Sequence, residues 1–470
     1  MSQIVIGKKD IGWAYIGSFF KVAANIILLP VVLKFLSDDE LGIWYVFGSV
    51  SQFVVLLDFG FAATVARNIA YAWCGVDSLQ KDTIGSISDN QETNFEYFKL
   101  VLQTCKVIYT AISGVALLLL VTIGSFYINS LDSSSLIAWL IYSAGVAINM
   151  RYCYYTSFLL GVGAIAENNK AAIITKLAQI IVSIALLYAG LGVLGVSIGY
   201  FVSGLFLRIS SKIYFDNYEN IKDNLKKVAV KAPWTEVKKT FGIIWFNASK
   251  DGLVTLSSFL NTQANTLICS SVLGLATTGA YGLSVQLSAI AASVAGIPFS
   301  SALPKLQEKA AKQDLEGSQR LFSGTIALFF FSFIVLTVIV ILMLPIIKWL
   351  KPTITLDASI LLAVFLLALI NQIYQYSASL ISTFNTLPYT KAFIISSVAA
   401  VLLSYMLARV TSLGMWALII APIIVSFAYN FWKWPSYVLK LYNVSLGSFV
   451  KSGLNFSINI LSEIISKLKK

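Results

Sequence analysis

We single out six charged residues that fall inside long apolar stretches of this 470-residue sequence, where a membrane-spanning helix would bury them. They are Lys21, Arg151, Lys176, Lys250, Asp58 and Asp251. A charge near the centre of a bilayer costs between about 3 and about 10 kcal/mol, so such a residue turns toward the protein interior or a water-filled cavity. Four cations against two carboxylates would leave that cavity positive. The set therefore predicts the binding of an anion through charge-assisted hydrogen bonds.

Two of these cations, Lys21 and Arg151, fit a purely structural role least well. Lys21 lies about ten residues from either end of its apolar stretch, at the limit from which a lysine can extend to the membrane surface. Arg151 sits among three tyrosines in the stretch NMRYCYYTSFLLG (149–161). We therefore predict that Lys21 and Arg151 line the cavity.

The other candidate residues have secondary or alternative roles. Lys176 and Lys250 are assigned to the same anion-binding cavity. The sequence leaves two interpretations of Asp58 and Asp251 open: each pairs with a lysine on another helix, or each carries a coupling proton or sodium ion. Four residues are expected to line or gate the cavity less directly: Arg67, Asn25, Tyr155 and Tyr374. For Arg67, near the end of its stretch, extension to the membrane surface is the simpler explanation.

The composition indicates which elements position these residues. Hydrophobic residues make up 57% of the chain and charged residues only 12%, with a mean hydropathy of +0.80, whereas a soluble domain carries about 25% charged residues. The excess apolar surface must face lipid. The apolar stretches are long and continuous, which indicates membrane-spanning α-helices rather than a β-barrel. The first stretch, 11–36, is too long for the core of a signal peptide and is interpreted as an uncleaved span.

Several classes of function are disfavoured by the residues present. Histidine is absent, which removes the commonest general base, and the four cysteines show no metal-ligand spacing. No Walker-type phosphate-binding motif occurs, so the chain does not use ATP directly. The net charge of +12 fits basic cytoplasmic loops better than a nucleic-acid partner. We expect a protein that is not an enzyme and has no cofactor, no metal and no nucleic-acid partner.

Twelve candidate spans follow from the hydropathy pattern. They are 11–36, 42–66, 99–128, 135–163, 169–190, 193–214, 240–273, 278–303, 320–349, 357–385, 388–410 and 413–435. The connecting loops alternate between basic and weakly charged. The positive-inside rule then places both termini in the cytoplasm, and an even number of spans agrees with that.

The longest basic segment, 215–239, divides the spans six and six. Residues 35–49 align with 272–286 without a gap, and the span boundaries match at the same offset. This arrangement predicts two similar halves facing one another, as in many transporters. The expected domains are an N-terminal six-helix bundle (1–214), a basic cytoplasmic linker (215–239), a C-terminal six-helix bundle (240–440) and a tail (441–470).

Local patterns predict how the helices bend, pack and end. Prolines within or close to the ends of spans indicate kinks, at Pro30, Pro298, Pro345 and Pro422. Small residues indicate close helix contacts, at Gly195, Gly199 and Gly204. Tryptophans near span ends are interpreted as interfacial anchors: Trp13, Trp44, Trp139, Trp349, Trp416 and Trp434. Apolar residues of the tail recur at helical spacing and indicate an amphipathic helix on the cytoplasmic membrane surface: Leu454, Ile458, Leu461, Ile465 and Leu468.

Three motifs, in this order, carry a resemblance to a known family. They are LLDFGFAATVARNIAYAW (56–73), YYTSFLLGVGAIAENNKA (154–171) and SKDGLVTLSSFLNTQANTLICSSVLGLATTGAYGLSVQL (249–287), followed by SSALPKL (300–306). The sequence resembles the O-antigen flippases, polysaccharide transporters of the multidrug/oligosaccharidyl-lipid/polysaccharide (MOP) exporter superfamily. The match extends over nearly the whole chain.

The resemblance implies a fold, a function and partners. The implied fold is an all-α integral membrane protein with two six-helix bundles around a central cationic cavity. The implied function is to transfer undecaprenyl-diphosphate-linked oligosaccharide from the cytoplasmic to the periplasmic leaflet of the bacterial inner membrane by alternating access. The implied partners are this lipid-linked oligosaccharide, membrane lipids, an O-antigen polymerase and a chain-length regulator. The motifs place charged cavity residues of the family at Asp58, Arg67, Lys250 and Asp251.

Other functions stay open at this point. The same superfamily also includes exporters of drugs or metabolites, although a positive cavity disfavours cationic drugs. A flippase for the peptidoglycan precursor or another lipid-linked glycan would need the same charges. A membrane polysaccharide polymerase or ligase is disfavoured because every expected outer loop is short and histidine is absent. Coupling to proton or sodium antiport and transfer driven only by consumption of the product both stay open.

Overall fold

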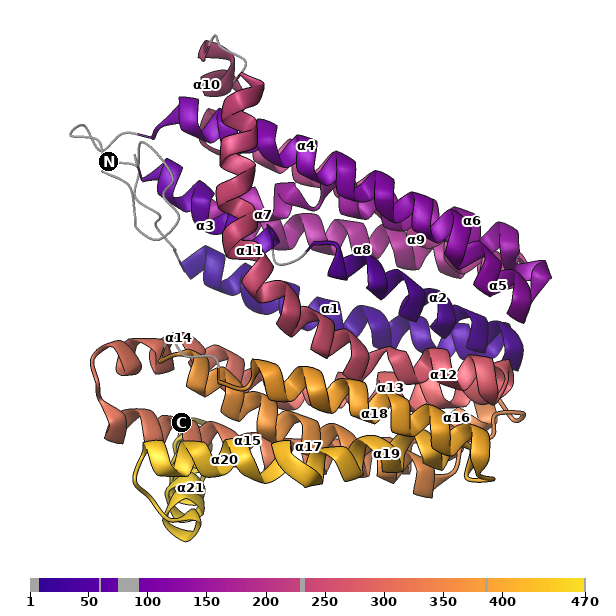
Figure 1. Ribbon diagram of the computed structural model, residues 1–470. Coiled ribbons are helices and arrows are strands. Elements are labelled where there is room, and N and C mark those ends of the chain that lie inside the picture. Colours follow the sequence, from indigo (N-terminus) through magenta and orange to yellow (C-terminus); the bar gives the residue numbers. More distant parts are fainter. Residues whose placement is uncertain (1–7, 59–60, 75–92, 229–232, 385–387, 469–470) are drawn as a thin grey trace. The chain divides into compact units, whose positions relative to one another are not determined.

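The computed structural model describes residues 8–58, 61–74, 93–228, 233–384 and 388–468. All regular structure within these ranges is helical (Figure 1). Because no water is available in the bilayer core, each backbone N–H and C=O must be bonded within its own segment, and a helix does this for a long apolar run.

The chain divides into two compact units, Met1–Phe259 and Leu260–Lys470. The helices of unit 1 are α1 (Lys8–Phe35), α2 (Asp38–Leu56), α3 (Phe61–Trp73), α4 (Phe95–Leu119), α5 (Ser125–Leu131), α6 (Leu136–Tyr152), α7 (Tyr154–Gly161), α8 (Ile165–Tyr188), α9 (Gly192–Asn217), α10 (Ile221–Lys227) and most of α11 (Trp234–Thr262). Unit 2 holds the end of α11 and α12 (Ala264–Val272), α13 (Leu275–Ala295), α14 (Ile297–Ala311), α15 (Leu315–Leu342), α16 (Leu344–Leu350), α17 (Ala358–Ser382), α18 (Thr390–Val410), α19 (Ala417–Val425), α20 (Phe431–Leu441) and α21 (Leu446–Leu468).

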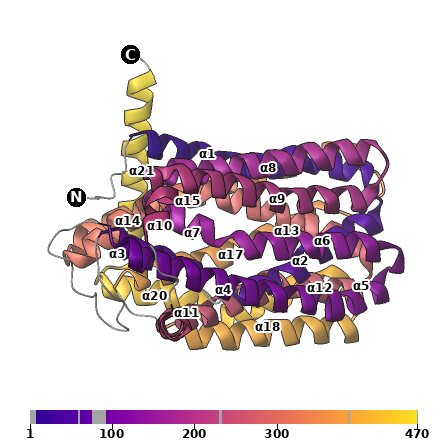
Figure 2. The ribbon, with the colours of Figure 1, turned by 90° about the horizontal axis from the view of Figure 1, so that it is seen from above.

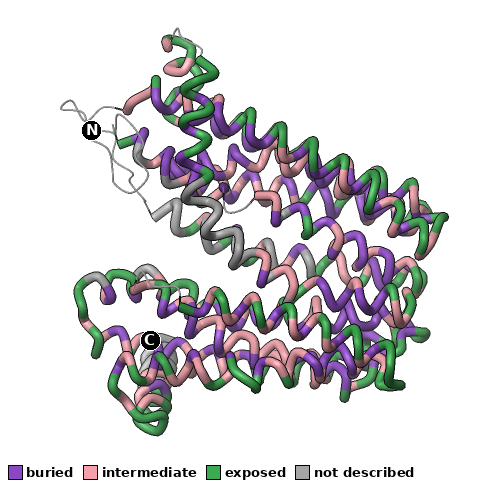
Figure 3. The backbone as a smooth tube through the Cα atoms, in the orientation of Figure 1, coloured by how far each residue is buried: buried purple, intermediate pink, exposed green. Residues whose placement is uncertain are grey.

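Long apolar helices make the chain a multi-pass membrane protein. Within the described ranges, eight helical segments are long and apolar enough to cross a bilayer, and a ninth is if α13 and α14, bent by 50°, form one span. In the most apolar stretch of α15 only 17% of the residues are buried inside the structure. The rest of that stretch is half-buried or exposed (Figure 3), and its exposed residues include Phe331, Ile334 and Leu342, as expected of a helix that faces lipid.

Each of the twelve predicted stretches coincides with one helix or with two or more consecutive helical segments, but several that were expected to be continuous are interrupted. Breaks occur between α2 and α3, at Cys153, at Gln263, at Gly296 and at Met343. Pro298 and Pro345 stand at the starts of α14 and α16, because proline lacks the N–H that would continue the preceding helix. The predicted kink at Pro298 is confirmed by the 50° bend between α13 and α14, and at Pro345 the helix is interrupted.

Helix α9 packs closely between α6 and α8 in unit 1. A Cβ atom built on Gly199 would lie 2.0 Å from the Ser183 hydroxyl of α8, and one on Gly204 would lie 3.0 Å from the Ile148 side chain of α6. These distances leave no room for a larger residue. The close helix contacts predicted from the small residues are therefore confirmed.

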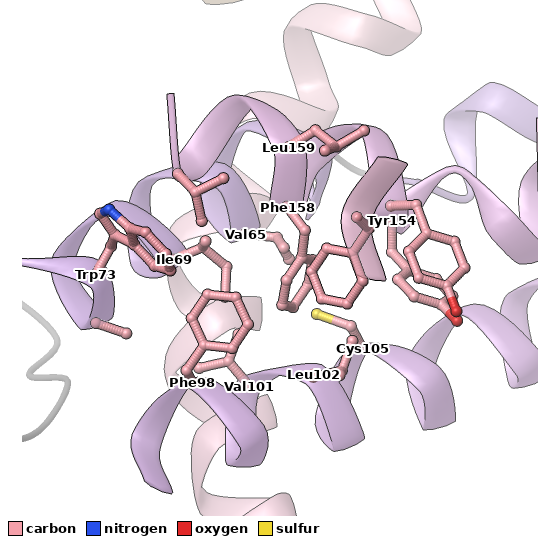
Figure 4. Packing of buried hydrophobic residues seen from close by; sticks show 14 of the residues in the cluster. Val65, Ile69, Trp73, Phe98, Val101, Leu102, Cys105, Tyr154, Phe158 and Leu159 are labelled. Carbon is pink, nitrogen blue, oxygen red and sulfur yellow. The ribbon is translucent and has the colours of Figure 1, made fainter. Parts of the chain in front are cut away.

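The core of unit 1 is an aromatic cluster where α3, α4, α7 and α9 meet (Figure 4). Phe98 packs edge-on against Phe158 at 5.4 Å and stacks on Phe215 at 6.2 Å between ring centroids. Phe215 and Ile221 belong to the segment expected to be a linker, yet both are buried in this cluster. The first part of that basic segment is thus packed into unit 1.

Two tryptophans predicted to be interfacial anchors have another role. Trp139 and Trp434 are only 0% and 3% exposed, so the prediction is wrong for them. The indole Nε1 of Trp139 donates to the Leu120 carbonyl at 3.0 Å, at the start of a π-helical turn that spans Leu120–Gly124. Trp434 donates in the same way to Asn430 Oδ1 at 2.9 Å. A buried indole N–H needs an acceptor, and Leu120 and Asn430, at the start of one π-helical turn and the end of a second (Ser426–Asn430), each supply one.

In unit 2, the Asn265 side chain supplies a hydrogen bond that a proline cannot make. Pro422 lies inside α19 and has no N–H to donate to the Leu418 carbonyl one turn before it. The Asn265 side-chain amide donates to that carbonyl instead, at 3.0 Å. Asn265 is buried, and its Oδ1 atom, which lines a cavity about the size of one water molecule, has no hydrogen-bond partner among the described residues.

We expect Asn265→Leu to destabilise the protein by about 1–3 kcal/mol, because it leaves the buried Leu418 carbonyl unsatisfied. The measurement is the thermal unfolding midpoint of the purified protein in detergent. Pro422→Ala is the matched background, because alanine restores the missing N–H, so Asn265→Leu should cost clearly less there. An equal cost in both backgrounds would contradict this role of Asn265.

Candidate functional site

Four cations from three helices gather on unit 1. They are Lys106 of α4, Arg151 of α6, and Arg208 and Lys212 of α9, and we refer to them as the cationic cluster. Lys106 interacts electrostatically with Arg151, with Lys212 and with the nearby Asp216. Arg151 and Arg208 lie over the same aromatic ring, that of Tyr152, with their guanidinium carbons 5.4 and 5.0 Å from its centroid. The ring thus holds two cations near each other that would otherwise repel.

Arg151 carries a buried donor that has no partner among the described residues. Its side chain also contacts the Tyr154 hydroxyl. Its Nη1 atom is nevertheless buried without a hydrogen-bond partner in the part of the chain that the structure describes. A buried donor on a charged group is costly to leave unpaired, so this atom is suited to an external acceptor such as a phosphate oxygen.

The surface beside these cations is both charged and apolar. A hollow of about 440 Å³ is lined only by α9 residues, namely Leu205, Arg208, Ile209, Lys212, Ile213 and Asp216. Ile209 and Ile213 are 53% and 52% exposed. A ligand held here would meet guanidinium and ammonium groups next to bare hydrocarbon. The arrangement fits an amphiphilic anion better than a fully water-soluble one.

Asp58 does not form an ion pair with any described residue. Its Oδ1 atom accepts a hydrogen bond from the Tyr109 hydroxyl at 2.8 Å, and its Oδ2 atom accepts one from the Ala62 N–H at 3.3 Å. The Tyr109 ring lies 6.0 Å from that of Tyr154, which contacts Arg151. Asp58 and Arg151 are therefore linked through two adjoining tyrosines.

The remaining predicted site residues lie in several places. Lys176 is partly buried on α8 and donates to Gln179 Oε1 at 3.0 Å. Tyr155 is buried in the core of unit 1 against Tyr154, and Tyr374 is buried in unit 2, where it donates to Asn371 at 3.0 Å. The side chains of five candidates lie outside the described residues: Lys21, Asn25, Arg67, Lys250 and Asp251. Their roles stay predictions, as does the cavity expected between two bundles.

Sequence reasoning missed three members of the cationic cluster: Lys106, Arg208 and Lys212. Arg208 lies near the end of its predicted span, where extension to the membrane surface is the simpler interpretation. A usable signal was present, since Arg208, Lys212 and Asp216 recur every four residues and so share one face of α9. Lys106 is a single charge within an apolar stretch, and only the packing of α4 on α6 brings it to the others. Among the described residues, no group of three or more cysteine, aspartate or glutamate side chains could hold a metal ion.

Comparison with solved structures identifies the fold. The chain matches a multidrug resistance MATE family transporter of the MOP superfamily in its inward-facing conformation, with a TM-score of 0.68 and 13% identity over 91% of this chain and 96% of that one. The fold is that of the MOP superfamily transporters. A MOP superfamily transporter from Pyrococcus furiosus, described as having a binding pocket of reverse polarity, matches with a TM-score of 0.55 and 12% identity over 94% of this chain and 99% of that one.

The outward-facing conformation of a MATE family transporter matches as well, with a TM-score of 0.53 and 14% identity over 94% of this chain and 99% of that one. No family model matches the sequence, and no curated protein matches it. The expected MOP-type fold is therefore confirmed over more than nine tenths of the chain. At 12–14% identity, these matches establish the fold of this chain and not its substrate.

Proposed function

We propose that this protein is a flippase that moves an amphiphilic, lipid-linked anion across a bilayer, specifically a polyprenyl-diphosphate-linked oligosaccharide of the O-antigen type. The observation that carries the proposal is the cationic cluster next to exposed apolar residues of α9. A diphosphate would accept hydrogen bonds from Arg151 and its neighbours, and its polyprenyl chain would lie against Ile209 and Ile213. Multidrug substrates that are cations would be repelled by the same cluster.

The fold supports transport as the mode of action. Proteins of this fold are described as transporters, and both inward-facing and outward-facing conformations are known among them. A headgroup that must cross about 30 Å of hydrocarbon needs protein groups to replace its hydration. We propose the bacterial inner membrane as the location, both termini in the cytoplasm, and an O-antigen polymerase and chain-length regulator as the proteins that use the product.

A deletion strain tests this function. Loss of surface O-polysaccharide, together with accumulation of the lipid-linked oligosaccharide on the cytoplasmic leaflet, is the expected result. Restoration by the plasmid-borne gene is the control. Unchanged surface glycan and an unchanged lipid-linked pool, in a strain without a second flippase gene, would overturn the proposal.

We further propose that Asp58 carries the coupling proton or sodium ion. Asp58→Asn keeps an oxygen that accepts from Tyr109 but removes the charge, so transport should lose its dependence on a pH or sodium gradient. Tyr109→Phe is the matched control, because it removes the same hydrogen bond and leaves the carboxylate, and it should keep the gradient dependence. The measurement is flipping in proteoliposomes under imposed gradients. An Asp58→Asn variant with the gradient dependence of the unaltered protein would refute the coupling role.

A further inference from the structure

The C-terminal helix α21 runs across the other helices of unit 2. Figure 2 shows it running across the direction of α15, against which it packs, and Figure 1 shows it at the end of the unit near the α14–α15 connection. A helix that crosses the membrane-spanning helices lies close to the plane of the membrane.

One face of α21 is fixed to α15 by close contacts. A Cβ on Gly453 would lie 2.6 Å from the Ser323 carbonyl oxygen, and one on Gly324 would lie 2.1 Å from the Phe456 ring. The Ser323 hydroxyl also bonds the Ser452 hydroxyl at 3.2 Å. Phe449 packs on Phe322 with 5.8 Å between ring centroids. These contacts from two consecutive turns set the rotation of α21 about its own axis.

The two remaining faces of α21 differ sharply in character. An exposed apolar stripe consists of Leu446, Val450, Leu454 and Ile458, which are 64%, 49%, 54% and 61% exposed. An exposed polar face consists of Ser448, Lys451 and Asn455. At 100° per residue, the apolar stripe lies about 130° from the side that contacts α15, and the polar face lies about 120° from it in the opposite direction. With α21 in the membrane plane, the apolar stripe faces the hydrocarbon and the polar face is turned toward water.

We propose that α21 is an interfacial helix that binds the anionic surface of the bilayer, with the apolar stripe among the acyl chains. The charge favours anionic lipid. Residues 431–470 contain six lysines and a single acidic residue, Glu463. Each lysine near an anionic surface adds about 1 kcal/mol of attraction. Because α21 packs against the N-terminal part of α15, this binding holds that part of α15 at the membrane surface. The inference does not depend on the cargo.

Depth-dependent quenching tests the proposal. A fluorophore is attached to Leu454→Cys or to Asn455→Cys in the full-length protein carrying Cys74→Ser, reconstituted in vesicles whose lipids bear bromine on their acyl chains. We expect the label at 454 to be quenched about twofold more than the label at 455, because only the former faces the acyl chains. Val450→Cys and Ser448→Cys provide a second pair in case either variant of the first pair fails to fold.

Equal quenching at the two positions of a folded pair would overturn the interfacial placement. The same labels in phosphatidylcholine vesicles, compared with vesicles that contain phosphatidylglycerol, test the lipid class. Stronger quenching at 454 in the phosphatidylglycerol vesicles is expected. Quenching that is indifferent to lipid charge would overturn the assignment to an anionic surface.

Discussion

Arg151→Ala is expected to lower flipping of a lipid-linked oligosaccharide about 10- to 100-fold at equal membrane abundance. The loss follows from one charge-assisted contact, worth about 1.5–3 kcal/mol, since the buried Nη1 atom has no partner within the described residues. Arg151→Lys should keep part of the activity, because it retains the positive charge but not the planar guanidinium that can bond two phosphate oxygens at once. Surface O-polysaccharide in a complemented deletion strain, with the protein quantified by immunoblot, measures both variants.

The matched control for this prediction is Arg409→Ala. Arg409 is an exposed arginine of unit 2 that, like Arg151, lies beside a tyrosine, since its Nε donates to the Tyr405 hydroxyl at 3.4 Å. It lies outside the cationic cluster, so its removal should leave flipping within about twofold of the unaltered protein, as for most surface substitutions. Full flipping activity of Arg151→Ala would show that Arg151 does not bind the anion.

Lys212→Glu is expected to weaken binding of the lipid-linked anion about tenfold or more. It removes one cation of the cluster, and its carboxylate would also lie near Lys106, whose side chain already interacts with residue 212. The carboxylate would offset the positive charge of Lys106, so this single substitution would remove the attraction of two cations for the ligand. Lys212→Arg keeps the positive charge and should bind normally. Binding is measured by the concentration dependence of flipping in proteoliposomes.

Lys226→Glu is the control that separates a change in the net charge of the protein from a change within the cationic cluster. Lys226 is exposed on α10 and pairs with Asp223 at 2.9 Å, where screening by solvent makes the pair worth little. We expect Lys226→Glu to leave the apparent affinity for the lipid-linked anion unchanged and Lys212→Glu to lower it. An equal effect of both would mean that net charge, rather than the cluster, governs binding.

The sequence predicted the architecture well, because the length and apolarity of a membrane span are local properties. The places where the spans are cut, at Cys153 and Gln263 for example, could not be read, since they depend on tertiary contacts rather than on hydropathy. Trp139 illustrates the same limit. Its position near a span end was read correctly, but the Leu120 carbonyl that its indole bonds belongs to another helical segment, which only the tertiary packing brings to it.

The candidate site was predicted in part. Arg151 was identified from the cost of burying its charge, and the structure places it beside other cations. Lys106, Arg208 and Lys212 were missed, because their contribution arises from the meeting of α4, α6 and α9. Asp58 was expected either to pair with a lysine or to carry an ion. The structure gives it hydrogen bonds from a tyrosine and a backbone N–H and no ion pair with a described residue, so that the coupling role stays the proposal.

The most direct test of anion recognition by the cationic cluster is a binding measurement on the purified protein. Native mass spectrometry would compare undecaprenyl diphosphate with undecaprenol, which has the same lipid chain without the phosphates, on the unaltered protein and on Arg151→Ala. We expect the unaltered protein to retain the diphosphate in strong preference to the alcohol, and Arg151→Ala to lose this preference. Equal retention of the two lipids by the unaltered protein would contradict anion recognition by the cluster.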